Sequence, residues 1–295
     1  MSTTLIAELL AIIAPVFLIA GIGFTWERAG LPFDTKQLTT LVTWVGTPTL
    51  VISTLLKTAP ALTSLGLMVV VGIAVHLATT AIGFLVLKHS GLPQKTYLPS
   101  LIFGNCGNMG LPLSLFAFGE SGLALAIAFF MVSAVGMFTV GQAIPVGRTS
   151  LITLVRTPIL WAVVFSITLL ATDTQLPRWA VNTVEVLGGF TIPIMLLALG
   201  ASLARLKVQS LGRSVWLGLL RIVGGMLVGL AIAALFGLEG SERGVTILLS
   251  AMPVAVFNYM FAQYYDNQPE EVAGLVVVST AMSFVMLPFM LPLLI

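Results

Sequence analysis

Long apolar stretches separated by short polar connectors run the whole length of the chain. A helix needs about 20 apolar residues to cross the roughly 30 Å hydrocarbon core of a bilayer. The stretches have about that length, so the pattern predicts an all-α membrane protein with ten membrane helices. Their expected positions, each uncertain by a few residues, are about 5–26, 37–57, 64–88, 96–119, 121–146, 158–175, 178–203, 212–238, 243–265 and 270–295.

Prolines fall in or beside these stretches in two series with similar spacing. The two series are Pro15, Pro32 and Pro48, then Pro158, Pro177 and Pro193. A proline inside a helix removes a backbone donor and opens a hydrogen bond of the ladder. Paired, interrupted apolar segments in matching halves of a chain indicate the binding site of a secondary transporter.

Composition supports the bilayer as the solvent of this chain. Hydrophobic residues make up 58% of it and charged residues only 8%, whereas soluble domains carry about 25% charged residues. The net charge is +2, and the absence of a basic block argues against a nucleic-acid partner. The run 5–26 lacks a basic lead-in and a clear cleavage site, so we expect it to be retained as a membrane helix.

Lysine and arginine set the orientation, because cytoplasmic loops carry an excess of them. One set of alternate connectors holds nine: Arg28, Lys36, Lys88, Lys95, Arg148, Arg156, Arg205, Lys207 and Arg213. The other set holds three: Lys57, Arg178 and Arg243. This bias places both termini outside, in a membrane that we expect to be the bacterial inner (cell) membrane. Because each half has five helices, 147–295 enters from the side opposite to 1–146, which makes the repeat inverted.

Two of the ten stretches cannot form regular helices throughout. The fourth reads Phe-Gly-Asn-Cys-Gly-Asn-Met-Gly-Leu-Pro over 103–112. Glycine and proline weaken a helix, and asparagine needs hydrogen-bond partners in lipid. The ninth, at the equivalent place of the second half, contains Pro253 and Asn258. We therefore expect two helices that are broken near the middle of the membrane and cross each other.

Broken helices of this kind suit an anion. The N-terminal ends of half-helices carry partial positive charge and free N–H groups, which favour a carboxylate. The alternative is that small residues and asparagines serve packing alone. For the two breaks together we favour a binding site, formed by Asn105, Asn108 and Asn258 with Gly104, Gly107, Gly110, Pro112 and Pro253.

These motifs resemble those of the auxin efflux carrier superfamily, which includes plant PIN auxin exporters and bacterial carboxylate carriers. The sequence Asn-x-x-x-Met-Gly-Leu-Pro at 105–112 resembles the signature of the family's fourth helix. Ala-x-Pro at 251–253, followed by Phe-Ala-x-x-Tyr-x-x-x-Pro at 261–269, resembles the ninth helix. Two further motifs resemble the sixth and seventh helices: Arg156-x-Pro158, and Pro193 followed by Gly200 and Leu203.

The resemblance implies two inverted five-helix repeats, with helices 1, 2, 6 and 7 as a scaffold and the others as a transport domain. It also implies a homodimer through the scaffold and an elevator-type movement, with the substrate carboxylate bound where helices 4 and 9 cross. Asn105 matches the crossover asparagine of the family. Gly104 and Asn258 stand where PIN proteins have crossover prolines, which favours a more polar substrate such as a dicarboxylate.

Three ionisable residues lie well inside the apolar stretches, where charge is costly and indicates function by default. Glu185 could couple transport to a proton or cation, or be a carboxylate near the outer end that is hydrated or paired with Arg178. His76 could relay protons, although a neutral side chain bonded to a neighbouring helix is favoured. Arg221 could attract anions, although we expect it to extend along the helix towards the interface.

The remaining candidates are polar or neutral. Gln142 and Gln263 could line a polar cavity and take part in ion coupling, as could Ser133 and Thr139. Cys106, the only cysteine, is expected to pack as a small apolar residue. With two histidines and no Cys/His cluster, the sequence predicts no metal site and no cofactor.

We therefore expect a secondary active transporter of small organic anions, either malate- or malonate-like or auxin-like. A sodium-coupled symporter of the bile-acid type is the alternative within this class, and a membrane-embedded ligand sensor is the alternative from another class. Enzymatic activity is not expected, because the stretches contain no cluster of His, Asp and Glu.

Overall fold

The computed structural model describes residues 3–146 and 156–295 of the chain. Arg148 and the expected junction between the two halves lie outside the described residues. Helices account for the regular structure of the described part, and its one strand-like pairing is an isolated bridge between Gly104 and Val254. The expected class, an all-α membrane protein, is confirmed.

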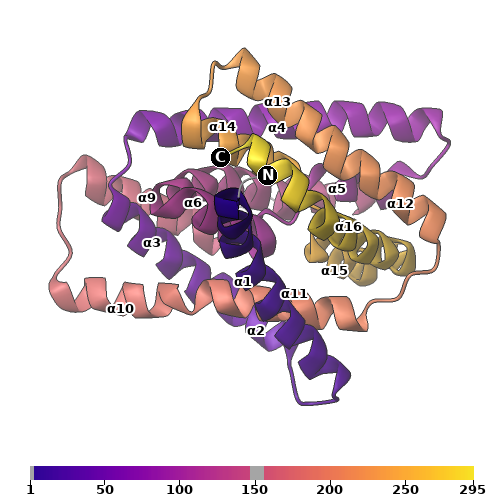
Figure 1. The fold of residues 1–295 in the computed structure, drawn as a ribbon, viewed down its shortest axis with the longest axis horizontal. Helices are drawn as coiled ribbons and strands as arrows, with labels where there is room; N and C mark the ends of the chain where they lie inside the picture. Colours follow the sequence, from indigo (N-terminus) through magenta and orange to yellow (C-terminus); the bar gives the residue numbers. More distant parts are fainter. Residues whose placement is uncertain (1–2, 147–155) are drawn as a thin grey trace.

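The first half of the chain forms a series of helices, several of them joined end to end (Figure 1). The η labels mark short π-helical turns, apart from η5, which is a 3-10 turn. The elements are α1 (Thr3–Arg28), α2 (Thr35–Leu41), η1 (Val42–Gly46), α3 (Thr47–Thr58), α4 (Leu62–His89), α5 (Gln94–Ile102), η2 (Cys106–Gly110), α6 (Leu111–Gly136), η3 (Met137–Gly141) and α7 (Gln142–Val146).

The second half follows a similar order. After α11 a connector runs along the edge of the molecule to α12, and the C-terminus lies in the same region as the N-terminus in Figure 1. The elements are α9 (Pro158–Ala171), α10 (Arg178–Gly189), α11 (Thr191–Arg205), α12 (Leu211–Leu219), η4 (Leu220–Gly224), α13 (Gly225–Leu235), α14 (Gly240–Ser250), α15 (Val256–Tyr264), α16 (Pro269–Met290) and η5 (Leu291–Leu293).

Length and composition single out seven helical segments of the described chain that could cross a membrane, and one shorter apolar helix, α9. The expected fourth and ninth stretches are interrupted instead. Helices α5, α14 and α15 have 9, 11 and 9 residues, and at 1.5 Å per residue none of them spans a bilayer alone. The expected boundary near 119–121 is a local break inside α6, where Gly119 has φ +68°.

The prolines of the two series stand both at helix starts and inside continuous helices. Pro158 lies in the first turn of α9, and Pro177 precedes α10. The first turn tolerates proline because its N–H groups have no intrahelical acceptor. Pro15 lies inside the continuous helix α1, and Pro48 follows the π-turn η1 inside the continuous helical segment Thr35–Thr58. None of these four prolines therefore ends a helix in the way that the two broken stretches end.

The helices form two packing groups. The first packing group comprises α1, α2, η1, α3, α9, α10 and α11. Its closest pair is α1 and α11, where a Cβ added at Gly200 would overlap with the backbone of Ala20, and one at Gly23 with that of Leu197. Membrane helices associate through such small residues because their backbones can approach closely.

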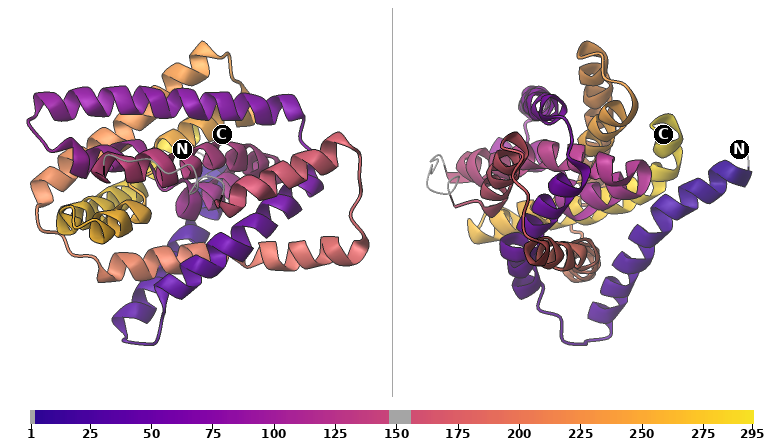
Figure 2. Two further views of the ribbon diagram at one scale, coloured as in Figure 1. Left: turned by 180° about the vertical axis from the view of Figure 1, so that it is seen from behind. Right: turned by 90° about the vertical axis from the view of Figure 1, so that its left-hand side faces the viewer.

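The second packing group comprises α4 to α7, η2, η3 and α12 to α16. Figure 2 shows α4 and α13 of this group along one side of the molecule, with α10 and α11 of the first group along the other. Large apolar side chains such as Leu77 and Trp179 are exposed on outer helix faces, at 66% and 73%. Exposed apolar faces on this scale are expected where the solvent is lipid.

Candidate functional site

The two interrupted helices meet at their breaks. The chain leaves the helix after Ile102 in one half and after Ser250 in the other, and the two extended segments pair antiparallel through Gly104 and Val254. The backbone N–H of Asn105 donates to the carbonyl of Pro253 at 2.7 Å. These contacts place the fourth and ninth expected helices side by side at their interruptions.

The local sequence explains both breaks. Pro253 has no N–H to continue a helix, and the N–H of Val254 donates to the Ser279 hydroxyl at 3.1 Å instead. In the other half, Phe103 adopts an extended conformation. Its carbonyl accepts from the Ala255 N–H at 3.3 Å. The two extended segments therefore satisfy some of each other's backbone N–H and carbonyl groups. Such pairing is needed because the hydrocarbon core of a membrane offers no water to these groups.

A cleft with about 760 Å³ of space, counted out to its mouth, runs between the two packing groups beside the breaks. The second packing group supplies both asparagines of the first break, and α2, η1 and α3 of the first packing group supply one threonine each. These residues are Gly104, Asn105, Gly107 and Asn108, then Thr39, Thr43 and Thr47.

Three of the four π-helical turns in the described residues border this cleft. They contribute Val42 from η1, Asn108 from η2 and Met137 from η3. A π-turn widens the helix locally, and such turns occur frequently at functional sites. The fourth, η4, carries a residue of the crossing itself, Arg221. The irregular parts of the helices are thus concentrated around one place.

Asn105 has hydrogen-bonding capacity to spare at the edge of the cleft. Its side chain is 4% exposed, and its amide nitrogen has no partner among the described residues. The helix that begins at Cys106 adds the N–H groups of Gly107 and Asn108, for which the described chain shows no acceptor. Buried donors without acceptors are costly, and an anionic guest in the cleft would satisfy them.

The other residues expected at the site lie behind the cleft. Asn258 is 4% exposed and donates from its side-chain nitrogen to the Phe103 carbonyl at 2.9 Å. A Cβ at Gly110 would overlap with the Leu249 side chain. Pro112 is buried in the first turn of α6. The structure therefore brings all eight residues to one region, but only four of them line the cleft.

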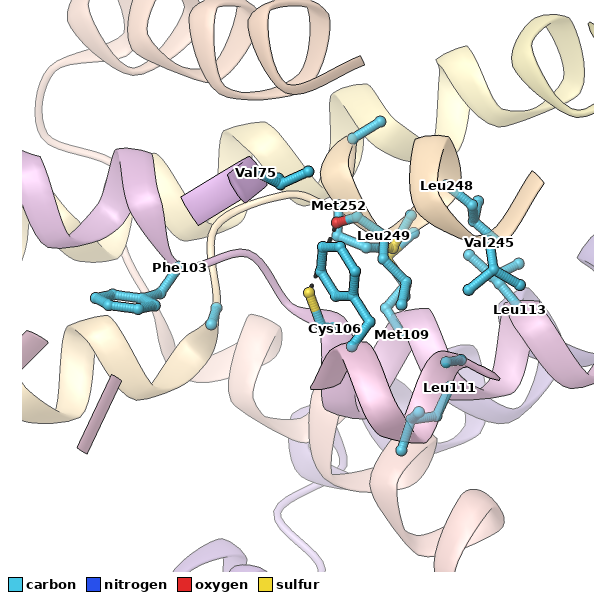
Figure 3. Close-up of a cluster of buried hydrophobic side chains, with 14 of the residues drawn as sticks. Val75, Phe103, Cys106, Met109, Leu111, Leu113, Val245, Leu248, Leu249 and Met252 are labelled. Atoms are coloured by element: carbon cyan, nitrogen blue, oxygen red, sulfur yellow. Dashed lines mark hydrogen bonds between the residues drawn. The ribbon is translucent and has the colours of Figure 1, made fainter. Parts of the chain in front are cut away.

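An apolar cluster joins the two interrupted helices behind the cleft (Figure 3). Met109 from one half packs against Leu249 and Met252 from the other. Cys106 is buried in this cluster, as expected, and its thiol approaches the Leu249 carbonyl at 3.6 Å. This packing fixes the position of the breaks relative to each other.

Arg221 lies at the crossing rather than at the membrane interface, so the expected extension towards the interface is wrong. It is 4% exposed, and its Nη1 donates to the Ser250 carbonyl at 3.0 Å. A Cβ at Gly104 would overlap with the guanidinium Nη2. The absence of a side chain at Gly104 leaves the space that the Arg221 guanidinium occupies. The apolar stretch around Arg221 does not indicate this space, because Gly104 belongs to a different segment of the chain.

His76 also lies close to the crossing. Its ring centroid is 5.8 Å from that of Phe103 and 5.6 Å from that of Phe129. Its Nδ1–H donates to the Gly72 carbonyl at 2.7 Å, which belongs to the same helix and not to a neighbouring one as expected. The ring is thus held between aromatic side chains and does not line the cleft.

The three other coupling candidates lie away from the cleft. Glu185 is exposed and borders a second pocket with Lys57 and Asp173, and no ion pair with Arg178 is present among the described residues. Gln263 is exposed, and Gln142 is half-buried at the start of α7. The described residues contain no group of His, Cys, Asp and Glu that would hold a metal ion.

Comparison with known proteins gives matches along nearly the whole chain. Residues 9–147 and 144–291 match the family described as "Membrane transport protein". An uncharacterized transporter of Methanocaldococcus jannaschii is 26% identical over 200 residues, which cover 63% of this chain and 64% of that protein, slightly less than two thirds. An uncharacterized transporter of Methanothermobacter thermautotrophicus is 24% identical over 298 residues, with 97% and 96% covered.

Proposed function

Since the chain belongs to the membrane transport protein family, as its resemblance to the auxin efflux carriers predicted, we propose that it is a secondary carrier of small carboxylates. The family makes it a membrane transporter and not an enzyme. The observation that carries the proposal is the buried amide nitrogen of Asn105, which has no partner among the described residues and borders a cleft beside helix N–H groups that also lack acceptors there. An anion is the guest that such donors favour.

The carrier works by alternating access between two inverted five-helix repeats. The first packing group corresponds to the scaffold that the family resemblance implies, and the second to the transport domain. Both breaks lie in the second group, and the cleft lies between the groups. Sliding of one group against the other would carry the site across the membrane as an elevator does, because the ligand's donors move with the second group.

Charge supports an orientation for this movement. The cleft is lined by Thr39 and Thr157, which follow Lys36 and Arg156 closely in the sequence. These basic residues belong to the connectors expected in the cytoplasm. The cleft then opens towards the cytoplasm, with both termini outside the cell membrane. The scaffold would form a homodimer through its lipid-exposed face.

The walls of the cleft favour a small substrate. Phe130, Phe138 and Phe257 line it together with the asparagines, so that apolar rings surround a few polar groups. Two amides and two backbone N–H groups suit one or two carboxylates of a short molecule, such as a malonate- or malate-like dicarboxylate. An auxin-like monocarboxylate would place its ring against the phenylalanines.

Transport by reconstituted protein tests the proposal. The purified chain in proteoliposomes should exchange labelled malonate, malate, succinate or indole-3-acetate, and Asn105→Ala should abolish this exchange, because it removes the free donor. Asn182→Ala, on an exposed face of α10, serves as the matched control and should leave exchange unchanged. Size-exclusion chromatography checks that both variants are folded.

Two results would overturn the proposal in different ways. Unchanged exchange by Asn105→Ala would remove this residue from the site. Binding of these carboxylates without counterflow of labelled substrate would indicate a ligand sensor instead of a carrier.

A further inference from the structure

Arg221 is a buried cation that pairs with no acidic side chain of the described residues. It is 4% exposed. The salt bridges of the described chain join other residues, and its Nε atom has no hydrogen-bond partner there. A charged side chain inside a membrane is expensive and needs compensation from nearby groups. What surrounds Arg221 therefore indicates what the charge does.

The compensation comes from the C-terminal end of an interrupted helix. Helix α14 ends at Ser250, whose carbonyl accepts from Nη1 of Arg221 at 3.0 Å. The last carbonyls of a helix have no partners within it and carry partial negative charge. The guanidinium thus occupies the place beside a broken helix where a small cation would otherwise be favoured.

Two glycines and a π-turn bring the side chain to this position. Arg221 belongs to η4, which interrupts the regular turns between α12 and α13. A Cβ at Gly225 would overlap with the Ser250 carbonyl and lie 2.8 Å from Nη1 of Arg221. A Cβ at Gly104 would overlap with Nη2. The guanidinium therefore lies against the backbone of the first break.

Gly104 separates the guanidinium from the cleft. Gly104 lines the cleft, whereas Arg221 lines a separate narrow crevice with Thr79 and Leu101 on the opposite side of the break. A charge at this depth acts across one residue of backbone, in surroundings of low dielectric where its field is weakly screened. An anion beside Asn105 would experience that field without touching the arginine.

We propose that Arg221 is a built-in cation of the crossing, which holds the end of α14 and attracts the anionic substrate from behind Gly104, so that binding needs no sodium ion. This inference rests on the proposed function and deepens it. It makes Arg221 a positioning residue rather than a direct ligand. It also argues against the sodium-coupled alternative, because a covalently attached charge takes the place of the ion.

Ligand binding by charge variants tests the inference. Affinities of the purified protein for malonate, malate, succinate and acetate are measured by isothermal titration calorimetry in sodium chloride and in choline chloride. For the wild type we expect the same affinity in both salts. Arg221→Gln should weaken binding at least about tenfold, because the charge is lost in a weakly screened position. Arg221→Lys, which keeps the charge and loses the fork of donors, should stay within about threefold.

Controls separate charge from folding. Arg178→Gln removes the same charge from an exposed position and should bind like the wild type. Thermal unfolding of the Arg221 variants in detergent reports the loss of the Ser250 contact. A purely structural arginine would make the Lys and Gln variants equally weak in binding, and that result would overturn the inference.

The outcomes for the inference and for the proposed function differ. Failure of the wild type to bind any of the four carboxylates would refute the proposed function itself. Binding by the wild type that is unchanged in Arg221→Gln would refute the role of the arginine alone. Wild-type affinity that falls when choline replaces sodium would also refute it, and would favour the sodium-coupled alternative.

Discussion

The two interrupted helices reach the same place with different chemistry. The first break presents Asn105, Asn108 and two glycines to the cleft, with donors that have no acceptor in the described part of the chain. The second break contributes Ala255 and Phe257 to the cleft, and its one asparagine, Asn258, is bonded to the Phe103 carbonyl. One break is therefore equipped to bind a guest, whereas the other holds the first in position.

This difference shows that buried asparagines at two neighbouring breaks need not share a role. Asn105 and Asn258 are equally buried, at 4% exposed each. Asn258 donates to backbone from the other half of the chain, and Asn105 keeps its amide nitrogen free. A free donor predicts an effect on ligand binding, and an occupied donor predicts an effect on stability. The predictions below separate these two kinds of effect.

The largest effect is expected from a side chain at the crossing. Gly104→Ala places a Cβ where the Arg221 guanidinium and the Met252 carbonyl already lie. Overpacking of this kind costs about 3 kcal/mol, and the displaced arginine should abolish transport. Gly189→Ala is the control, because nothing lies within 4 Å of the added Cβ. Chemical unfolding in detergent measures both, and a stability of Gly104→Ala equal to that of the control would contradict the packing described here.

A smaller loss of stability is expected from the second break. Asn258→Ala removes the donor to the buried Phe103 carbonyl, which keeps its bond from the Ala255 N–H. Loss of one buried hydrogen bond should lower the free energy of unfolding by about 2 kcal/mol. The affinity for carboxylates should fall less than in Asn105→Ala, since Asn258 does not line the cleft. A variant as stable as the wild type that no longer binds would reverse the assigned roles.

The stability of Asn105→Ala should hardly change. Its amide nitrogen has no partner to lose, so the free energy of unfolding should stay within about 0.5 kcal/mol of the wild type. The same variant is expected to abolish transport, and this combination distinguishes a binding residue from a structural one. Parallel unfolding curves for the Asn105 and Asn258 variants make the comparison direct. Equal destabilisation of the two variants would indicate that Asn105 and Asn258 both have a structural role.

Much of this arrangement could be predicted from the sequence, because apolar length and helix-breaking residues act locally. The glycines and asparagines of 103–112 and the proline at 253 indicated both breaks and their meeting. Pro48 and Pro253 look alike in the sequence, because both fall inside apolar stretches. The helical segment Thr35–Thr58 nevertheless continues past Pro48, whereas the chain leaves helix α14 before Pro253. Only the packing shows which proline belongs to a break.

The environment of single polar side chains was harder to predict. Arg221 lies two turns into an apolar stretch, where extension to the interface is the usual solution. Its burial depends on the space left by two glycines. Gly104 is far from Arg221 in the sequence, and Gly225, one turn further along the same helix, does not alter the apolar pattern. For Glu185 the sequence left open a coupling carboxylate and a hydrated or paired one, and the structure leaves the side chain exposed. Both depend on contacts between distant segments.

The smallest effect is expected far from both breaks. Lys57 of α3 and Glu120 of α6 form an ion pair at 3.0 Å that joins the two packing groups. Lys57 lies at the opposite end of the 35–58 segment from Thr39, which lines the cleft. Because both side chains are exposed, at 59% and 43%, Lys57→Gln should change stability by less than about 0.5 kcal/mol.

An ion pair between two groups that slide against each other can matter for movement even when it contributes little to stability. Because an exposed ion pair contributes so little free energy, Lys57→Gln should change the rate of malonate exchange by less than about twofold. The double variant Lys57→Glu with Glu120→Lys restores opposite charges and should return the rate to that of the wild type. A much faster exchange in Lys57→Gln that the double variant reverses would show that the pair restrains the movement. Transport would then be controlled by this ion pair as well as by the binding role of the first break and the structural role of the second.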